Sequence, residues 1–95
     1  MNNVTITLSH PIQRGEKLID AVTLRKPKTG ELRGLKRMDL LQLDETQTAA
    51  LLTRISEPAL TDADIAGMDI EDSTKLMVEV LAFFTGAPSP SASMM

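Results

Sequence analysis

Hydrophobic and polar residues alternate along residues 3–9 (NVTITLS), where Val4, Ile6 and Leu8 fall on one face. A period of two with β-branched residues predicts a strand that has one buried face. The histidine-proline pair at 10–11 is expected to end this strand.

A second strand pattern follows at residues 17–25 (KLIDAVTLR), although its register near the start is ambiguous. Residues 13–16 (QRGE) supply a turn in which Gly15 can adopt a positive φ. Pro27 closes the second strand because it has no N–H for the ladder. The two runs predict a β-hairpin whose apolar face must be covered by other elements.

The hydrophobic spacing then changes to that of helices. Thr29 is expected to cap a short helix that starts near Gly30 or Glu31, and Gly34 weakens this helix by about 1 kcal/mol. Its apolar stripe is expected at three-residue steps: Leu32, Leu35, Met38 and Leu41.

A stronger helix is predicted after Asp44, a good N-cap with Gln47 in a box-like position. Pro58 ends this segment. The inner face of the helix is expected to carry Ala49, Leu51, Leu52 and Ile55.

Thr61 opens a helix of one or two turns, with Asp64 at the third position and Gly67 as its stop. The best helix follows, from Ile70 to Thr85, and it is expected to end before a glycine. Its inner face is expected to carry Ile70, Leu76, Met77, Val80, Leu81, Phe83 and Phe84.

Taken together, these elements predict an α+β fold with an N-terminal β-hairpin followed by three to four α-helices. A chain of 95 residues fits one small domain, which we place at residues 1–86. Residues 87–95 (APSPSASMM) are small and polar, so we expect a flexible C-terminal tail.

The composition excludes several classes of site and function. There is no cysteine, which excludes disulfides, cysteine-based zinc sites and thiol catalysis. The aromatic residues are Phe83 and Phe84, too few for a nucleic-acid stacking platform. The longest apolar run is residues 80–84, far short of a membrane span, and the start has no signal-peptide pattern. We therefore expect a soluble protein that does not enter a membrane.

The net charge of −3 is divided unevenly. Residues 1–40 hold eight Lys/Arg and four Asp/Glu, whereas residues 41–95 hold two Lys/Arg and nine Asp/Glu. Such a split can mark a basic arm for nucleic acid, or a head-to-tail assembly in which one end attracts the other. The third interpretation is two oppositely charged surfaces that weakly stabilise one fold.

The residues that could carry chemistry form no catalytic set. His10 is the one histidine, and its sequence neighbours supply neither the orienting acid nor the nucleophile that a catalytic histidine needs. Five acids toward the C-terminus do not follow the ligand order of a calcium loop, and helix capping accounts for most of them: Asp62, Asp64, Asp69, Glu71 and Asp72. We expect no enzyme activity, no metal and no cofactor.

The stretch VTLRKPKTGELRGL at residues 22–35 carries Arg25, Lys26, Lys28 and Arg33. It lacks the residue order of a phosphate-binding P-loop, although a helix start after basic residues can attract an anion. A small DNA-binding or regulatory module that uses the basic 25–37 region is the alternative that this stretch leaves open.

Three motifs occur in order along residues 4–85. They are ITLSHPI at 6–12, TLRKPKTGELRGL at 23–35, and a final helix that opens MDIEDSTKL at 68–76 and ends near FF at 83–84. In this order they resemble the phage tail assembly chaperones of contractile-tailed phages, the protein E-like family. Lys26 and Lys28 depart from the family pattern, which has an acid and a small polar residue there.

The resemblance implies a non-enzymatic assembly factor in the host cytoplasm. Such a protein binds the tape-measure protein and keeps it soluble for tail tube assembly, and it binds neither nucleic acid nor membrane. The resemblance also implies a frameshifted longer version of the chain and self-association into a homo-oligomer. A structural component of the virion or a tail terminator is a further alternative.

We predict partner binding at six residues of the second and third motifs: Arg25, Lys26, Lys28, Arg33, Phe83 and Phe84. The two arginines are further expected to form ion pairs with the acidic C-terminal half. The two lysines are expected to face solvent or a partner.

Overall fold

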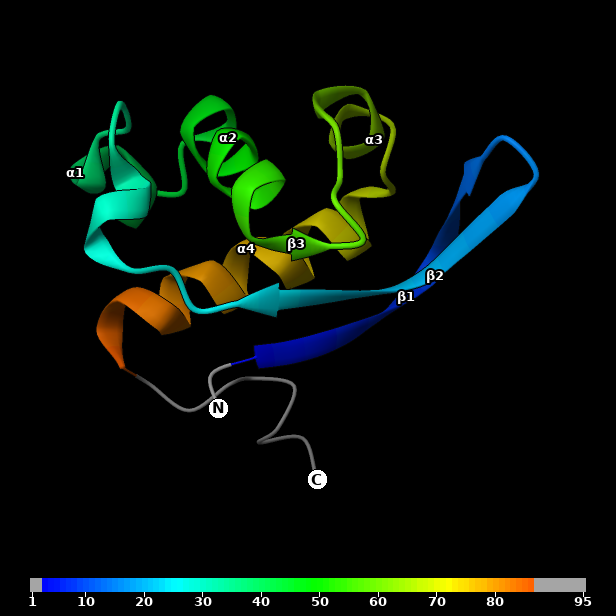
Figure 1. Cartoon of the computed structure of the whole chain (residues 1–95), viewed down its shortest axis with the longest axis horizontal. Helices are drawn as coiled ribbons and strands as arrows, with labels where there is room; N and C mark the ends of the chain where they lie inside the picture. Colours follow the sequence, from blue (N-terminus) through cyan, green and yellow to red (C-terminus); the bar gives the residue numbers. More distant parts are fainter. Residues whose placement is uncertain (1–2, 87–95) are drawn as a thin grey trace.

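A computed structural model describes residues 3–86 of the chain. Within this range a three-stranded antiparallel sheet in the order β1-β2-β3 packs against helices, so the predicted α+β class is confirmed. Figure 1 shows α1, α2 and α3 along one side, with α4 running beneath them beside the strands. The elements are β1 (Asn3–Arg14), β2 (Lys17–Arg25), the 3-10 turn η1 (Thr29–Leu32), α1 (Arg37–Leu41), α2 (Glu45–Ile55), β3 (Ser56–Glu57), α3 (Asp62–Ala66) and α4 (Ile70–Thr85).

The predicted hairpin is confirmed. β1 and β2 pair antiparallel with Ile6 opposite Val22, and the turn contains Gly15 at a φ of 59°. A side chain at such a φ is strained, which explains the glycine. The alternation also holds, because Ile6 and Val22 are buried while Thr5 on the opposite face is exposed.

The prediction that residues 10–11 end the first strand is wrong, because β1 continues to Arg14. Pairing is interrupted between Thr7, opposite Ala21, and Ile12, opposite Ile19. Residues 8–11 therefore form a bulge opposite a single residue of β2. Pro11 lies within this bulge, where its missing N–H interrupts no ladder bond.

The single helix expected after Thr29 is also wrong, because the structure has two short pieces, η1 and α1. Gly34 separates them with a φ of 85°, a conformation that ends a helix. The break rotates the apolar stripe, so Leu40 is buried and Met38 is 64% exposed.

The later helices and their caps are confirmed. The Asp44 side chain accepts a hydrogen bond from the Gln47 N–H at 2.9 Å, which starts α2. Thr61 and Asp64 form a reciprocal capping box at α3. Ile70 differs from its prediction, since it is 76% exposed at the first position of α4 and faces away from the core.

The strand β3 (Ser56–Glu57) had no sequence signal of its own, because two residues cannot show a period. It pairs with β2 through Thr23 and Leu24 and so ties the end of α2 to the sheet. The core is a single aliphatic cluster against which Phe83 and Phe84 pack at the edge: Ile6, Leu8, Ile19, Val22, Leu24, Leu40, Leu51, Leu52, Ile55, Leu60, Ile65, Leu76 and Val80.

Across residues 3–86 no helix combines the length and the hydrophobicity that are needed to cross a bilayer. The tail predicted at residues 87–95 lies outside the described residues.

Candidate functional site

Four of the six residues predicted for partner binding line one pocket. Lys26 and Lys28 come from the loop after β2, and Phe83 and Phe84 come from the last turns of α4. The pocket has a volume of about 260 Å³ and is completed by Pro27, Thr29, Leu32 and Arg37. We refer to these eight residues as the basic-aromatic pocket.

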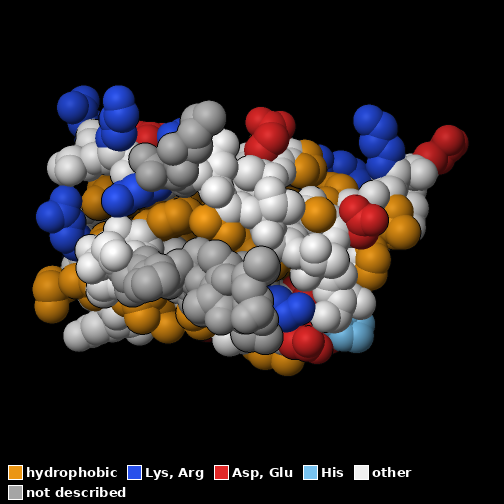
Figure 2. All heavy atoms as spheres, turned by 90° about the horizontal axis from the view of Figure 1, so that it is seen from below, with side chains coloured by type: hydrophobic (Ala, Val, Ile, Leu, Met, Phe, Trp, Pro, Cys, Tyr) orange, Lys and Arg blue, Asp and Glu red, His pale blue; other side chains and the backbone are white. Residues whose placement is uncertain are grey.

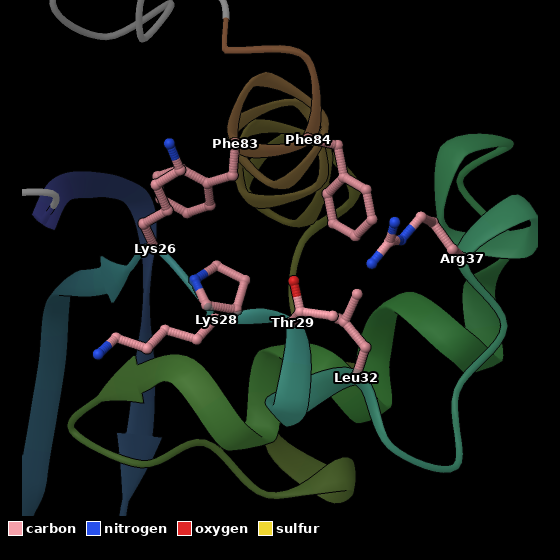
Figure 3. Close-up of a pocket in the computed structure, with 8 residues that line it drawn as sticks. Lys26, Lys28, Thr29, Leu32, Arg37, Phe83 and Phe84 are labelled. Carbon is pink, nitrogen blue, oxygen red and sulfur yellow. The ribbon is translucent and has the colours of Figure 1, made fainter.

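The basic-aromatic pocket is apolar below and cationic around its rim. Phe83, Phe84 and Leu32 are half-buried against the core, whereas the cationic rim is exposed. Figure 3 shows the two rings projecting from the end of α4 and the Arg37 guanidinium pointing toward Phe84. Such a surface suits an apolar side chain that has a carboxylate beside it.

Sequence reasoning did not assign Arg37 to this site. Arg37 is the first residue of α1, and it reaches the pocket because Gly34 turns the chain between η1 and α1. Its position in a basic segment was a weak signal, and the turn that directs it toward the pocket was not visible in the sequence.

Arg25 does not line the pocket, and its acidic partner differs from the one expected. Its guanidinium pairs with Glu31 in the same half of the chain, through Nη1 to Oε1 at 2.7 Å and a second contact from Nη2 to Oε2. The Arg25 hydrogen bond and the Lys28 backbone N–H lower the pKa of Glu31 to about 2. The prediction of an ion pair with the acidic C-terminal half is therefore wrong.

Arg33 also lies outside the pocket, and its side chain makes no ion pair within residues 3–86. Its carbonyl oxygen instead accepts a 2.9 Å hydrogen bond from Arg54 Nη1, which also donates to the Glu31 carbonyl at 2.7 Å. Arg25 Nη2 in turn donates to the Arg54 carbonyl at 3.1 Å. Arg25 and Arg54 thus hold the loop that carries the two pocket lysines.

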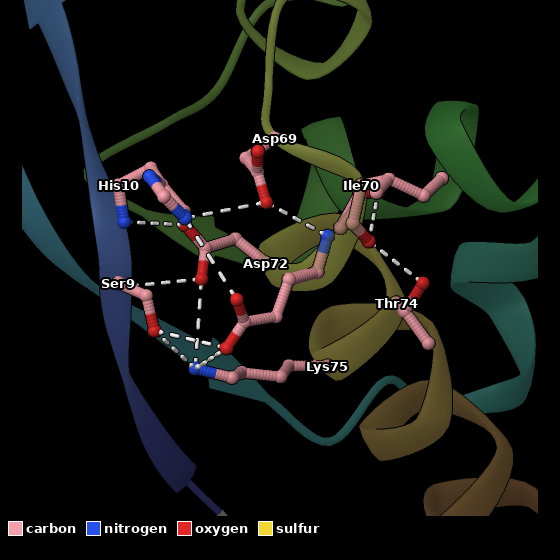
Figure 4. A network of polar contacts seen from close by, with 9 residues as sticks. Ser9, His10, Asp69, Ile70, Asp72, Thr74 and Lys75 are labelled. Carbon is pink, nitrogen blue, oxygen red and sulfur yellow. Dashed lines mark hydrogen bonds and ion pairs between the residues drawn. The ribbon is translucent and has the colours of Figure 1, made fainter.

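A second polar network joins the start of α4 to the bulge of β1 (Figure 4). The Asp72 carboxylate is buried and accepts 2.8 Å hydrogen bonds from the backbone N–H groups of Ser9 and His10. Lys75 Nζ lies 3.5 Å from Asp72 Oδ1. Burial raises the pKa of Asp72, but the two N–H donors and Lys75 outweigh it and hold that pKa below the usual range.

His10 acquires acidic neighbours that its local sequence does not reveal. Its Nε2 atom lies 3.5 Å from Asp69 Oδ2 and 3.7 Å from Glu71 Oε1, and all three side chains are at least one-third exposed. These groups are close enough together to approach a single cation. Asp69 already caps α4, and Lys75 lies 3.7 Å from Glu71, so the structure gives both acids other roles.

The three motifs therefore meet in two places at opposite ends of α4. The first motif, around Ser9 and His10, contacts the acidic opening of the last helix. The second motif forms the basic-aromatic pocket with the Phe-Phe pair that ends that helix. The hydrogen bonds from Ser9 and His10 to Asp72 tie the hairpin to the start of α4. The residues at the other end of α4 form the open basic-aromatic pocket.

Comparison with known proteins identifies relatives across nearly the whole described chain. The family model described as "Phage tail assembly chaperone proteins, E, or 41 or 14" matches residues 5–85. Tail assembly protein E of Escherichia phage P2 is 34% identical over 80 residues, covering 84% of this chain and 88% of that protein.

A second relative, tail assembly protein E′ of Escherichia phage P2, is 35% identical over 78 residues. That match covers 82% of this chain but 55% of the relative, so this chain corresponds to little more than half of E′. No solved structure was found to match this chain.

The family match spans all three motifs and the two places where they meet, and the chain belongs to the family of phage tail assembly chaperones.

Proposed function

We propose that this tail assembly chaperone binds the tape-measure protein and keeps it soluble for tail tube assembly. The role is non-enzymatic, and it is carried out in the cytoplasm of the host bacterium. The observation that carries the proposal is the basic-aromatic pocket, because it unites Lys26, Lys28, Phe83 and Phe84 on one open surface.

The chemistry of the pocket suits one face of an amphipathic helix. Phe83, Phe84 and Leu32 offer apolar area to a leucine- or isoleucine-like anchor, and the cationic rim suits acids on the same helix. Shielding of apolar helix faces is what keeps a long helical protein from aggregating. The pocket therefore supports a chaperone that masks short segments of a helical client.

Co-expression with the tape-measure protein of the same phage tests the proposal. The expected result is that tape-measure protein stays soluble and co-purifies with the parent chain. Phe84→Ala should lower the captured amount about tenfold, since a buried anchor contributes roughly 1–3 kcal/mol. Leu18→Ala, an exposed apolar residue on the hairpin, is the matched control and should leave capture unchanged.

Tape-measure protein that is equally soluble without the chain, and that never co-purifies with it, would refute the proposal. Circular dichroism of Phe84→Ala separates lost binding from lost folding, because Phe84 also packs against the core.

We also propose that a longer form of this chain is made by frameshifting, and that it partners the short form. This is supported by the relationship to E′, which is longer than the matched region. An antibody against residues 3–86 should detect two products in infected or induced cells. Detection of one product of the short length would rule out the longer form.

A further inference from the structure

A histidine and two carboxylates converge where the bulge of β1 meets the start of α4. His10 belongs to the bulge, Asp69 caps α4, and Glu71 lies in the first turn of that helix. Each side chain offers one ligand atom, and these atoms all lie within 4.8 Å of one another. Within residues 3–86 this is the one group of three or more histidine, cysteine or acidic side chains that lie so close together. We refer to His10, Asp69 and Glu71 as the histidine-carboxylate cluster.

The distances within the histidine-carboxylate cluster fit the coordination of a metal ion. His10 Nε2 lies 3.5 Å from Asp69 Oδ2 and 3.7 Å from Glu71 Oε1, and Figure 4 shows His10 and Asp69 facing each other. Both distances are longer than a direct N–H···O hydrogen bond, which spans about 2.7–3.2 Å. A zinc ion holds nitrogen and oxygen ligands at about 2.0–2.2 Å, so a tetrahedral site places neighbouring ligand atoms about 3.3–3.6 Å apart. Small rotations of these side chains would therefore complete such a site.

The other contacts of the two acids leave oxygen atoms for a metal. Asp69 Oδ2 accepts the capping hydrogen bond from the Glu71 N–H at 3.0 Å, and Asp69 Oδ1 has no hydrogen bond within residues 3–86. Ser9 Oγ and Lys75 Nζ contact Glu71 Oε2, at 3.2 Å and 3.7 Å, whereas Oε1 faces His10. Because a carboxylate has about four lone-pair sites, capping and metal binding are compatible.

The charge around the cluster also favours a cation. The buried Asp72 adds a third carboxylate beside Asp69 and Glu71. In the part of the chain that the structure describes, Lys75 is the one lysine or arginine that pairs with any of the three. Three carboxylates and one ammonium group leave two negative charges when the imidazole is neutral, and a neutral imidazole with ionised carboxylates is the form that binds metal. A divalent cation would balance these two charges.

The cluster is open to solvent. All three side chains are at least one-third exposed, and His10 and Asp69 also line a cavity of about 370 Å³. Figure 2 shows the pale blue histidine side chain at the surface of the molecule, near Asp and Glu side chains. A metal ion could therefore enter from solvent and keep water as a further ligand.

We propose that the histidine-carboxylate cluster binds one divalent transition-metal ion of the zinc class. The ligands are Nε2 of His10 and one carboxylate oxygen each from Asp69 and Glu71. An imidazole nitrogen suits zinc-like ions, whereas magnesium and calcium prefer sites made of oxygen alone. The sequence by itself predicts no metal here, because His10 is far from the two acids along the chain and the fold brings the three together.

The bound ion would strengthen the junction between β1 and α4 that Asp72 already holds. An ion that binds the folded chain and not the unfolded chain raises the stability of the fold. This site goes beyond tape-measure binding and lies at the end of α4 opposite the basic-aromatic pocket. Failure of tape-measure capture would therefore leave the metal site unaffected.

Calorimetric titration of the purified full chain with zinc chloride tests the proposal. The chain must carry no polyhistidine tag and must first be treated with a chelator. We expect one zinc ion per chain, and a melting temperature that rises with zinc and returns to its starting value with excess chelator. Because the chain has one histidine, the imidazole C–H signals in its NMR spectrum report on His10 alone and should shift as zinc is added.

Three ligand variants locate the ion. His10→Ala, Asp69→Asn and Glu71→Gln should each weaken zinc binding by at least about tenfold, a loss that even outer-shell partners of a metal can produce. Asparagine is as good a helix cap as aspartate, so Asp69→Asn keeps the start of α4. Glu57→Gln is the matched control, because it neutralises an exposed carboxylate outside the cluster, and it should bind zinc as the parent does. Circular dichroism of the metal-free variants checks that each one is folded.

A parent chain that takes up no zinc would overturn the proposal. Equal zinc affinity in the parent and the three ligand variants would overturn it too, as would zinc binding that leaves the His10 signals unshifted. Titration with magnesium chloride is the chemical control. Equal affinity for magnesium and zinc would show that the acids attract any cation, and the site would then be refuted.

Discussion

The Oδ2 atom of Asp72 accepts a 2.8 Å hydrogen bond from the backbone N–H of His10, across 62 positions of the chain. Its Oδ1 atom accepts an equivalent bond from Ser9. The bulge in β1 leaves these two N–H groups without partners in the strand ladder, and a buried unpaired N–H is costly. The carboxylate supplies the missing acceptors, so the bulge and the start of α4 depend on each other.

Asp72→Asn should destabilise the fold by about 2 kcal/mol, because an amide presents one acceptor where a carboxylate presents two charged ones. The melting temperature should fall by about 10 °C for a domain of this size. Glu71→Gln is the matched control, since its carboxylate is adjacent in the sequence but exposed. Equal melting temperatures for Asp72→Asn and the parent would contradict the assigned role.

Stability should decline in acid, and Glu31 should contribute to the decline. The pKa of Glu31 is held at about 2, below its ordinary value of 4.5. The ionised Glu31 side chain therefore stabilises the fold fully at pH values above 4.5. The stabilisation is lost as the pH falls through the acid range toward the folded pKa. Asp64 and Asp72 have lowered pKa values as well and act in the same direction.

Urea unfolding midpoints measured from about pH 7 to about pH 2 check this pH dependence. Glu31→Gln should flatten the decline relative to the parent. Glu57→Gln is the control, because Glu57 is exposed and makes no ion pair within residues 3–86. An unchanged slope for Glu31→Gln would show that the Arg25–Glu31 pair adds nothing in solution.

Thr48→Val should stabilise the protein by about 1 kcal/mol, since it removes a buried hydroxyl whose desolvation is uncompensated. The Thr48 hydroxyl is fully buried and finds no hydrogen-bond partner within residues 3–86. Thr53 on the same helix donates to the Ala50 carbonyl at 2.7 Å, so Thr53→Val should bring no gain. Thermal unfolding of both variants checks the prediction, which fails if Thr48→Val melts below the parent.

Lys28→Glu should weaken capture of tape-measure protein about tenfold, because it reverses one charge on the rim of the basic-aromatic pocket. Lys17→Glu makes the same change of charge on the hairpin, outside the pocket, and should have little effect. Pull-down at low salt checks both variants. Equal losses for the two lysines would indicate a general charge effect, and salt-sensitive DNA binding lost with Lys28→Glu would favour the nucleic-acid alternative.

Gly34→Ala should destabilise the fold by about 1–2 kcal/mol, because Gly34 has a φ of 85° that an alanine adopts only with strain. Gly30→Ala is the matched control, since Gly30 has an ordinary φ and open space around it. Chemical denaturation of both variants checks the difference. If the two substitutions cost the same, the break between η1 and α1 does not depend on Gly34.

Much of the fold was predictable because its determinants are local. The alternation of Ile6, Leu8, Val22 and Leu24 identified the hairpin, and Asp44, Thr61 and Asp69 marked the starts of three helices. In each case the deciding atoms are within a few positions of one another in the sequence, as with the Asp44 carboxylate and the Gln47 N–H.

Some of the errors came from contacts that are distant in sequence, and others from local features that the patterns did not weigh. Residues 10–11 do not end β1, because Asp72 supplies acceptors that no local pattern reveals. The exposure of Met38 follows from the local break at Gly34, and Ile70 is exposed because it stands at the first position of α4. Four residues of the predicted site line one pocket: Lys26, Lys28, Phe83 and Phe84. Arg25 instead pairs with Glu31, a carboxylate six residues away in the sequence, and not with an acid of the C-terminal half.

The helix α4 has a mechanical consequence for the pocket. It has 16 residues and is therefore about 24 Å long. Its first turn is fixed to β1 through Asp72, and its last turns carry Phe83 and Phe84. A helix is stiff along its axis, so the contacts that fix the first turn of α4 also limit where its last turns can lie. The hairpin therefore helps to fix where the two rings lie in the basic-aromatic pocket.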